Sequence, residues 1–489
     1  MATHGFIHRL RLSPQPSSRW TTSEDLERGA VHTQSSAATH PTSRCTRLAP
    51  LALGIVLAFG AVSAAEAQSL NELYEAARAF DASYLAARAL ADSAVYKAEQ
   101  VHGLRRPNVS LNASVNRTGS DIPASDTTNK SGTAGIAGSQ TLFNRANDAL
   151  IAQADKGVEA AKADVDAAEQ DLIVRVAQAY FDVLASQDAL TTATASKTAI
   201  AEQLASAKRN FEVGTATITD TREAQARYDL ATATELFAQN DLLTKRIALD
   251  TLVGRSGVMP HPLVGPVTLA PLLPGTVDEW VGPSDQAPNV RKFRLAYDVA
   301  KLETDKARAG NLPTVELAGS YGKGHANTTG TTLSALGPTS IDSSGPTTQS
   351  NIGVTLKLPL YAGGAIQNRV KETLLLEDQS RNNLEAARRA AAQSTRQAYF
   401  SLESLQAQVK ALEAAESSSL LALEATQLGY KVGVRVNLDV LNAQTQLYTT
   451  RRDLAKARYD VLVNSLKLRQ AAGTLTSEDV LKVNQLLAK

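Results

Sequence analysis

The sequence predicts an α+β membrane protein in which each half of the chain joins a pair of β-strands to a very long helical hairpin. Three features carry this prediction: an internal repeat, two long segments without proline, and short segments in which apolar and polar residues alternate. A segment without proline can form an uninterrupted helix. Strict alternation places the apolar side chains on one face of a strand.

The internal repeat has a constant spacing. Several short motifs recur 219 residues apart (433 minus 214), which means that both halves kept the same length between them. We therefore expect the two halves to lie side by side in one assembly. The matched motifs are Gln178–Phe181 with Gln397–Phe400, Val213–Gly214 with Val432–Gly433, Asp220 with Asp439, and Gly254 with Gly473.

The segments without proline are expected to form the hairpins. No proline occurs between Pro123 and Pro260, or after Pro359. Both segments have apolar residues every seven positions, which predicts coiled-coil packing. Since glycine permits the backbone to turn, the repeated glycines predict hairpin tips near residues 213–219 and 432–438. The seven-residue series are Ile151, Val158, Val165 and Leu172, and Val440, Leu447, Leu454 and Val461.

Four segments alternate as strands with one apolar face do. An apolar outer face and a polar inner face are typical of an outer-membrane barrel, although a soluble β-sandwich shows the same pattern. Four strands cannot close a barrel, and open sheet edges are not tolerated in lipid. Strands from several chains must therefore join, so the sequence implies an oligomer. The expected strands lie near residues 109–116, 132–143, 315–321 and 352–361, with polar surface loops at 118–131 and 322–349.

Residues 1–67 are interpreted as an N-terminal extension followed by a secretory signal peptide. The apolar run 48–62 follows basic residues and precedes the small residues of an Ala–Glu–Ala cleavage site at 65–67. A membrane anchor is the weaker alternative, because the run has about 15 residues and a membrane span needs about 20. The single cysteine, Cys45, would leave with the signal, so the mature chain has no thiol for a disulfide.

The remaining chain is divided by a proline-rich connector. We expect a first repeat at 68–259, with a helix, a strand pair at about 107–143 and a helical hairpin at about 144–254. The connector is expected at 260–288. A second repeat at 289–475 should have a helix, a strand pair at about 313–361 and a hairpin at about 364–472, and a C-terminal tail should follow at 476–489.

Composition and motifs argue against several classes of function. The net charge is +1, which gives no attraction to nucleic acid. We expect no cofactor and no metal site, because the three histidines outside the N-terminal extension, His102, His261 and His325, are far apart in sequence. Neither a phosphate-binding glycine loop nor a nucleophile elbow is present, so an enzyme is not expected.

Four stretches resemble the TolC family of outer-membrane efflux proteins: residues 213–220, 358–364, 430–443 and 457–475. The resemblance covers essentially the whole mature chain. It implies a homotrimer in which twelve strands form one barrel in outer-membrane lipid, and in which long helices form a periplasmic tunnel closed at its far end. It also implies two partners, a periplasmic adaptor protein and an inner-membrane transporter.

The resemblance assigns roles to residues of the hairpin tips. Tyr430 and Arg435 would bond to Asp220 and Thr219 as a gate network, and Asp439 would form a carboxylate ring at the pore constriction. Without the resemblance, the simpler interpretation is that Arg435 and Asp220 form an ordinary solvent-exposed ion pair and that Asp439 is an acidic residue at a helix N-terminus. The constriction departs from the family at Asn442, where the best-known members carry a second aspartate. The adaptor-docking positions are Val213, Gly214, Thr215, Val432, Gly433 and Val434.

The predicted function is that of a passive export duct, located in the outer membrane and extending into the periplasm. It would expel small toxic compounds or secrete proteins, and it would open when the hairpins rearrange at the periplasmic end. A periplasmic structural or adaptor coiled-coil protein without a pore is the alternative. That alternative explains the heptads and the export signal, but not the four alternating strands.

Overall fold

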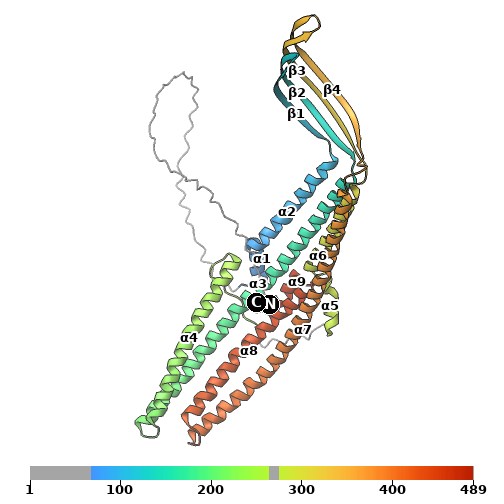
Figure 1. Cartoon of the computed structure of the whole chain (residues 1–489). Coiled ribbons are helices and arrows are strands. Elements are labelled where there is room, and N and C mark those ends of the chain that lie inside the picture. Colours follow the sequence, from blue (N-terminus) through green and yellow to red (C-terminus); the bar gives the residue numbers. More distant parts are fainter. Residues whose placement is uncertain (1–67, 264–274, 488–489) are drawn as a thin grey trace, which may run out of the picture. The chain divides into compact units, whose positions relative to one another are not determined.

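The computed structural model describes residues 68–263 and 275–487. The expected signal peptide and the middle of the expected connector lie outside the described residues. In the first half, β1 (Asn108–Ile122) and β2 (Ser125–Phe143) are followed by α3 (Arg145–Glu212) and α4 (Ile218–Val253), as Figure 1 shows. The strands are preceded by α1 (Leu70–Phe80), α2 (Ala82–His102) and the 3₁₀ turn η1 (Gly103–Arg105).

The second half has the same order of elements. Strands β3 (Thr314–Ser334) and β4 (Gly337–Lys357) are followed by α7 (Ala365–Lys431) and α8 (Asn437–Ala471). Helices α3 and α7 have 68 and 67 residues, and α4 and α8 have 36 and 35, so both hairpins have long and short arms of matching length. The other helices are α5 (Val277–Ser284) and α6 (Pro288–Ala309) before the strands, and α9 (Ser477–Asn484) near the C-terminus.

Side chains at the ends of the helices explain where the helices begin and end. Asn144 accepts hydrogen bonds from the backbone N–H groups of Ala146 and Asn147, which fixes the start of α3 directly after the strand pair. Asp81 caps α2 in the same way. Gly254 has a φ of 71° and ends α4 in the left-handed conformation that glycine adopts without strain.

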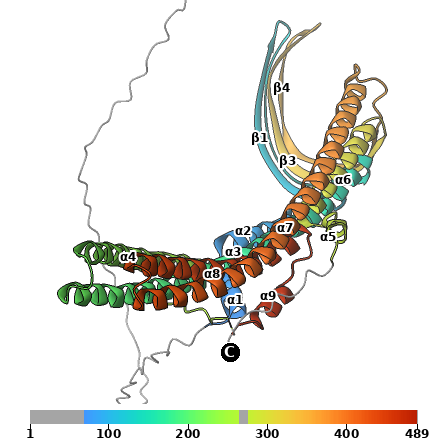
Figure 2. The ribbon, with the colours of Figure 1, turned by 90° about the horizontal axis from the view of Figure 1, so that it is seen from below.

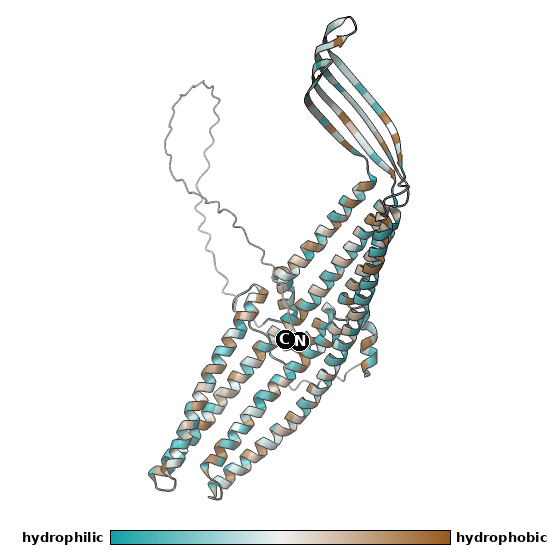
Figure 3. Ribbon diagram, viewed as in Figure 1, coloured by the Kyte–Doolittle hydropathy of each residue, from teal (hydrophilic) through white to brown (hydrophobic). Residues whose placement is uncertain are grey.

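The four strands form one antiparallel sheet in the order β1-β2-β3-β4. Strands β2 and β3 pair with each other and thereby join the two halves of the chain. Apolar residues lie next to one another across the sheet, as Leu111 pairs with Ile136 and Ile136 with Tyr321. The alternation of apolar and polar residues along the strands is visible in Figure 3. One face of the sheet is therefore apolar in its helix-proximal part.

The strands are longer than expected, and the predicted polar loops at 118–131 and 322–349 are wrong. Strands β1 and β2 stay paired up to a turn at residues 123–124, and β3 and β4 up to a turn at 335–336. These segments are rich in serine, threonine and glycine, which is typical of loops. In a paired ladder the backbone groups that face the neighbouring strand are satisfied, and threonine fits a pleated surface well, so polar sequence is compatible with strands here.

The long helix α3 is the central element of the helical part. It packs against α2 and α6 in its strand-proximal half and against α4 and α8 in its other half, while α7 packs against α6 and α8. The two hairpins therefore lie side by side, and both views show the pairs α3–α4 and α7–α8 (Figures 1 and 2). None of the helices among the described residues combines the length and apolarity that a membrane-spanning helix needs.

The largest apolar core lies midway along α3. Tyr180 and Phe181 are almost completely buried there, as expected for packing residues, and Phe181 stacks on Tyr459 of α8 with ring centroids 5.8 Å apart. The Tyr459 hydroxyl donates to Asp188 Oδ2 at 2.7 Å, and burial together with this carboxylate raises the pKa of the phenol. This core joins the two hairpins at their middle.

Charged and polar side chains join the halves closer to the sheet. Glu303 of α6 accepts from Gln153 Nε2 of α3 at 2.9 Å and from Arg369 Nη2 of α7 at 2.8 Å. Its neighbour Lys306 also donates to it. The hydrogen bond from Gln153 and the two cations lower the pKa of Glu303 from 4.5 to about 2. The carboxylate is therefore a fixed negative charge at neutral pH.

Candidate functional site at the hairpin tips

The two hairpins turn with the same backbone geometry. In the first tip the N–H groups of Thr215 and Ala216 donate to the carbonyl of Asn210, at 2.8 and 3.2 Å. In the second tip Val434 and Arg435 donate to the carbonyl of Gly429 in the same manner, at 2.9 and 3.2 Å. The predicted tip positions are correct, and the turn glycines, Gly214 and Gly433, have φ of 76° and 81°.

The predicted docking positions are exposed. Val213, Val432 and Val434 have relative exposures of 73%, 66% and 76%. A Cβ added to Gly214 or Gly433 would meet no atom within 4 Å, so these glycines are needed for their conformation and not for close packing. Thr215 is exposed as well. Each tip thus presents large apolar side chains to its surroundings.

The first tip satisfies its own polar groups. Asp220 accepts from the backbone N–H of Thr217 at 2.9 Å and from the Thr217 hydroxyl at 2.7 Å. The Thr217 hydroxyl oxygen in turn accepts from the backbone N–H of Asp220 at 3.2 Å. This reciprocal arrangement is a capping box that begins α4. Thr219 lies beside it in the first turn and is exposed.

The second tip bonds differently from the predicted gate network. Within the described chain Arg435 Nη1 lies 3.6 Å from Asp439 Oδ2, and the Tyr430 hydroxyl accepts from Asn210 Nδ2 at 3.1 Å. Tyr430 and Arg435 therefore have other partners than Asp220 within one chain, and Asp220 accepts from Thr217. Tyr430 bonds to the first hairpin through Asn210, which was not among its predicted partners.

Two further bonds between the hairpins were not predicted. Gln203 of α3 donates through Nε2 to Asn437 Oδ1 at the start of α8, and Arg227 Nη2 of α4 donates to Asn442 Oδ1 at 3.0 Å. Asn437 is only 3% exposed. The predicted constriction residue Asn442 is thus held by the first hairpin in this structure.

The internal repeat contained a signal for these residues. Subtracting 219 places Phe211 opposite Tyr430, Ala216 opposite Arg435, and Ile218 opposite Asn437. At each of these positions the second hairpin has a hydrogen-bonding side chain where the first has an apolar one. Comparing the two copies position by position would have identified Asn437. The same comparison marks two of the residues on the first hairpin, since Gln203 is equivalent to Ala422 and Asn210 to Gly429, but it does not mark Arg227, which is equivalent to Gln446.

An apolar contact accompanies these bonds. Leu441 of α8 is completely buried and packs into a cluster of the first hairpin. Beside it Val440, also fully buried, packs against Leu423 of α7 within the second hairpin. The start of α8 is therefore fixed on two sides. The cluster around Leu441 consists of Ile200, Leu204 and Ala207 of α3 and Ala224 and Ala231 of α4.

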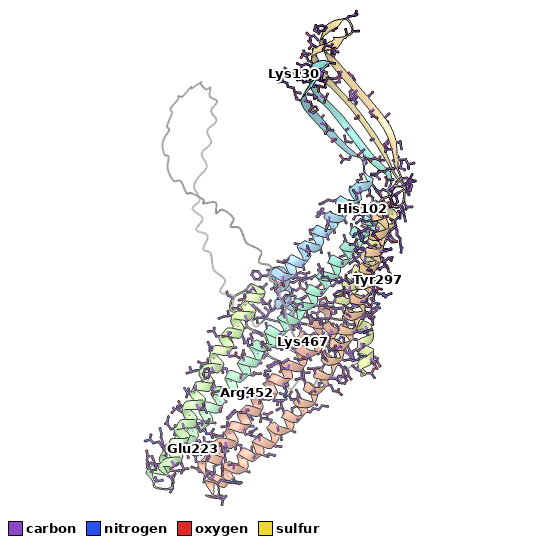
Figure 4. The ribbon with its side chains drawn as sticks, viewed as in Figure 1. His102, Lys130, Glu223, Tyr297, Arg452 and Lys467 are labelled. Atoms are coloured by element: carbon purple, nitrogen blue, oxygen red, sulfur yellow. The ribbon has the colours of Figure 1, made fainter. Side chains whose placement is uncertain are left out.

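Asp439 lies in the first turn of α8, where the helix dipole favours a negative charge. Its side chain is 36% exposed, and Arg435 lies one turn earlier in the chain. The corresponding position one turn later holds the amide of Asn442. Figure 4 labels Glu223, which is the repeat equivalent of Asn442, near the tip of the first hairpin. Carboxylates thus occur at the tips of both hairpins.

Comparison with known proteins identifies the family of the chain. The sequence model of the family described as "Outer membrane efflux protein" matches residues 73–255 and 284–474. The chain is 33% identical over 436 residues to the outer membrane protein TolC of Vibrio cholerae, a match that covers 89% of this chain and 97% of that protein. It is 32% identical to the alkaline protease secretion protein AprF of Pseudomonas aeruginosa, over 64% of this chain and 63% of AprF.

Solved structures share the fold. The outer membrane protein VceC of Vibrio cholerae superposes with a TM-score of 0.69 at 21% identity, covering 83% of this chain and 96% of VceC. CusC superposes with a TM-score of 0.71 at 19% identity, covering 83% and 92%. The chain therefore belongs to the outer membrane efflux protein family: it is an export channel and not an enzyme, and it lies in the outer membrane and extends into the periplasm.

Proposed function

We propose that three copies of the chain form one duct, in which twelve strands close a barrel and the hairpins form a tunnel below it. The observation that carries this proposal is the open sheet. Among the described residues, strands β1 and β4 are each paired on one side only. Because unpaired strand edges are not tolerated in lipid, β1 of one copy must pair with β4 of the next. The number three comes from the resemblance to TolC-type channels.

The helices support the same head-to-tail assembly. Helices α2 and α4 pack on one side of α3, whereas α7 lies on the other side of the chain beyond α6 and α8. Both sides expose large apolar side chains, which a neighbouring copy would cover. A head-to-tail contact that closes on itself generates a ring. The exposed residues include Leu90 and Tyr96 of α2, Phe237, Leu243 and Ile247 of α4, and Leu375, Phe400, Leu421 and Leu428 of α7.

We further propose that the chain contains a true two-fold repeat with the boundaries expected from its sequence. The matching arm lengths of the hairpins and the two separate stretches matched by the family model support it. In this assignment residues 68–259 and 289–475 are equivalent units. Helix α5 lies within the connector and α9 within the C-terminal tail.

The hairpin tips are proposed to bind a periplasmic adaptor, which couples the duct to an inner-membrane transporter. The exposed apolar residues Val213, Val432 and Val434, together with Gly214, Thr215 and Gly433, would form the contact. The duct itself supplies no energy in this scheme. Its cargo is proposed to be small molecules or proteins, since relatives are named both as an efflux protein, BepC of Brucella suis, and as a protease secretion protein.

In the proposed gate the second hairpin moves and the first stays in place. Tyr430 holds the closed state through Asn210, and Arg435 lies beside Asp439. In the closed ring α7 would neighbour α4 of the next copy, which would bring Arg435 towards Thr219 and Asp220 of that copy. Three copies of Asp439, with Asn442 one turn further on, would line the constriction and prefer cations. Docking of the adaptor would replace these bonds.

Conductance of the purified mature protein in a planar bilayer tests the proposal. We expect a small channel that prefers cations under a salt gradient, and Asp439→Ala should abolish the preference because the carboxylate ring is lost. Glu478→Ala is the matched control, since this exposed carboxylate lies at the start of α9, away from the tips. A folded trimer without any channel would favour the pore-free coiled-coil alternative.

A further inference from the structure

The outer part of the sheet carries a group of basic side chains that the export function does not use. Arg117 of β1, Lys130 of β2, and Lys323 and His325 of β3 are all exposed. These four residues are called the basic row below. Figure 4 labels Lys130 in the part of the sheet that is farther from the helices. None of the ion pairs in the described part of the chain includes one of the basic row.

The register places the basic row on the apolar face of the sheet. Strand β1 pairs with β2 without interruption, so Arg117 is on the same face as Val109, Leu111 and Val115. Lys323 and His325 likewise alternate in step with Leu317 and Tyr321 on β3. The opposite face of β1 carries Ser110, Asn112, Ser114 and Asn116, which are uncharged. The basic side chains therefore belong to the lipid-facing side of the proposed barrel, on which this inference rests.

The four residues are neighbours. Arg117 pairs directly with Lys130, and Lys130 pairs with Asn327, which is two residues from His325 on the same face. Lys323 follows two residues further along β3. Like charges directly opposite each other in a sheet destabilise it. Arg117 and Lys130 therefore repel each other, Lys323 adds a third positive charge four residues from Asn327 on the same face, and none of the ion pairs of the described chain gives them a counter-charge.

Strand geometry places the basic row at the outer edge of the membrane. Lys323 is eight residues from Val315, which is about 26 Å along the strand, or about 20 Å of height at a tilt of about 40°. Asn327, the partner of Lys130, is twelve residues away, or about 30 Å of height by the same estimate. The apolar band of such barrels is about 25 Å tall. The basic row thus straddles the level at which the acyl chains end.

This edge is the external one, because β2 continues at its other end into α3, which extends into the periplasm. Lysine and arginine at such a level keep their stems in lipid and place their charges among the headgroups. Beyond the basic row the same face carries Asp121, Asp126 and Asp342, which none of the described ion pairs joins to it. The positive charge is therefore confined to the headgroup level.

We propose that the basic row binds the phosphate groups of a phosphorylated glycolipid of the outer leaflet. Arginine and lysine form strong charge-assisted hydrogen bonds to phosphate oxygens. The apolar residues nearer the helices, such as Leu111 and Ile352, would contact the acyl chains of the same molecule. One lipid would therefore bind both the basic row and the apolar part of this face. Its phosphates would also remove the repulsion between Arg117 and Lys130.

Binding of fluorescent lipopolysaccharide to the detergent-solubilised trimer tests the proposal. The triple variant Arg117→Gln, Lys130→Gln and Lys323→Gln should bind about tenfold to a hundredfold more weakly, since each basic residue near a charged membrane surface contributes about a fivefold factor. The wild-type protein should bind the dephosphorylated lipid as weakly as the triple variant binds the intact one. Lys357→Gln is the matched control, because Lys357 is an exposed strand lysine at the helix-proximal end of β4.

Three outcomes would overturn the proposal: equal binding by wild type and triple variant, equal binding of intact and dephosphorylated lipid, or complete displacement by millimolar inorganic phosphate. The last result would mean that the site recognises free phosphate and not the lipid. Channel conductance of the same samples separates this proposal from the duct. If the triple variant conducts normally and no longer binds the lipid, both the lipid site and the duct are supported. If the wild-type protein forms no channel, the duct proposal alone is contradicted.

Discussion

The two hairpin tips have the same backbone turn but satisfy their polar groups in different ways. In the first, Thr217 and Asp220 form a capping box with each other. In the second, the N-cap residue Val436 gives α8 no side-chain hydrogen bond, and Asn437, the first residue of α8, instead accepts a bond from Gln203 of the first hairpin. The first tip is complete by itself, whereas the second depends on its neighbour.

The difference indicates which hairpin can move. Separating the tips breaks the bonds made by Tyr430 and Asn437 whichever hairpin moves, but the first tip then keeps its capping box, whereas the second is left without a side-chain cap. The surface by which α8 contacts its neighbours also contains unpaired polar atoms, since Asn437 Nδ2 and Gln444 Oε1 are buried without a hydrogen-bond partner in the described chain. Unpaired buried polar atoms lower the cost of separating two surfaces. The second hairpin is thus held, but only by an interface that a docking protein can replace.

The largest effect is expected from removing the apolar contact between the hairpins. Leu441→Ala should lower the free energy of unfolding by about 2–5 kcal/mol, because Leu441 is completely buried against the first hairpin. The repeat-equivalent residue, Arg222, is exposed, so Arg222→Ala should leave the stability nearly unchanged. Thermal unfolding followed by circular dichroism measures both. Equal losses in the two variants would mean that the hairpins are not asymmetric.

A smaller effect is expected from acid, and it should act near the sheet and not at the tips. The pKa of Glu303 is lowered from 4.5 to about 2, so its ionised form stabilises the fold above pH 4.5. This contribution should be lost as the pH falls from 4.5 towards 2, by roughly 1–3 kcal/mol, since one pKa unit corresponds to about 1.4 kcal/mol.

Melting temperatures between pH 6 and pH 3 test this prediction. Glu303→Gln should be less stable than wild type at pH 6 and should show a weaker loss on acidification. Glu385→Gln is the control, because its partner Arg389 lies on the same exposed face of α7. If Glu303→Gln lost stability with acid as steeply as wild type, the tether of Glu303 to Gln153 and Arg369 would not be the acid-sensitive contact.

The smallest effect is expected from the cap of the first tip. Thr217→Ala removes the hydroxyl that pairs with Asp220 and should destabilise the first turn of α4 by about 1 kcal/mol. Hydrogen exchange of the amides at the start of α4 should become faster, while exchange at the start of α8 should not change. Faster exchange at both tips would show that the first tip is not independent of the second.

Much of the fold could be predicted because it follows from local patterns. The absence of proline after Pro359 and the seven-residue apolar series predicted α7 and α8, and the turn glycines predicted the tips. The strand ends could not be predicted, since serine- and threonine-rich segments are compatible with both loops and strands. Only the pairing partner, which is distant in sequence, decides between them.

Sequence patterns predicted where the hairpins turn but not the bonds made there, and the gate and docking roles of the tip residues stay predictions. Tyr430 was expected to bond to the first hairpin, and it does so through Asn210. Asp220 was expected to accept from Arg435, but within the chain a local competitor, the hydroxyl three residues before it, engages it. Sequence identifies which side chains can bond, whereas the choice among partners depends on the register between helices, which is set by packing residues such as Leu441.

The most direct test converts the second tip into the first. Tyr430→Phe, Arg435→Ala and Asn437→Ile introduce the residues that the first hairpin has at the equivalent positions. They remove the bonds of Tyr430 and Asn437 to the first hairpin and the pair of Arg435 with Asp439 inside the second, and they leave the bond from Arg227 to Asn442 in place. Each lost bond is worth about 1 kcal/mol, or about a fivefold change in the ratio of closed to open channels. Single-channel conductance in a planar bilayer is the measurement, with Thr217→Ala as the control. We predict a larger conductance for the triple variant and a wild-type conductance for Thr217→Ala. A triple variant that folds, forms the same oligomer and conducts like wild type would contradict the assignment of the gate to the second hairpin.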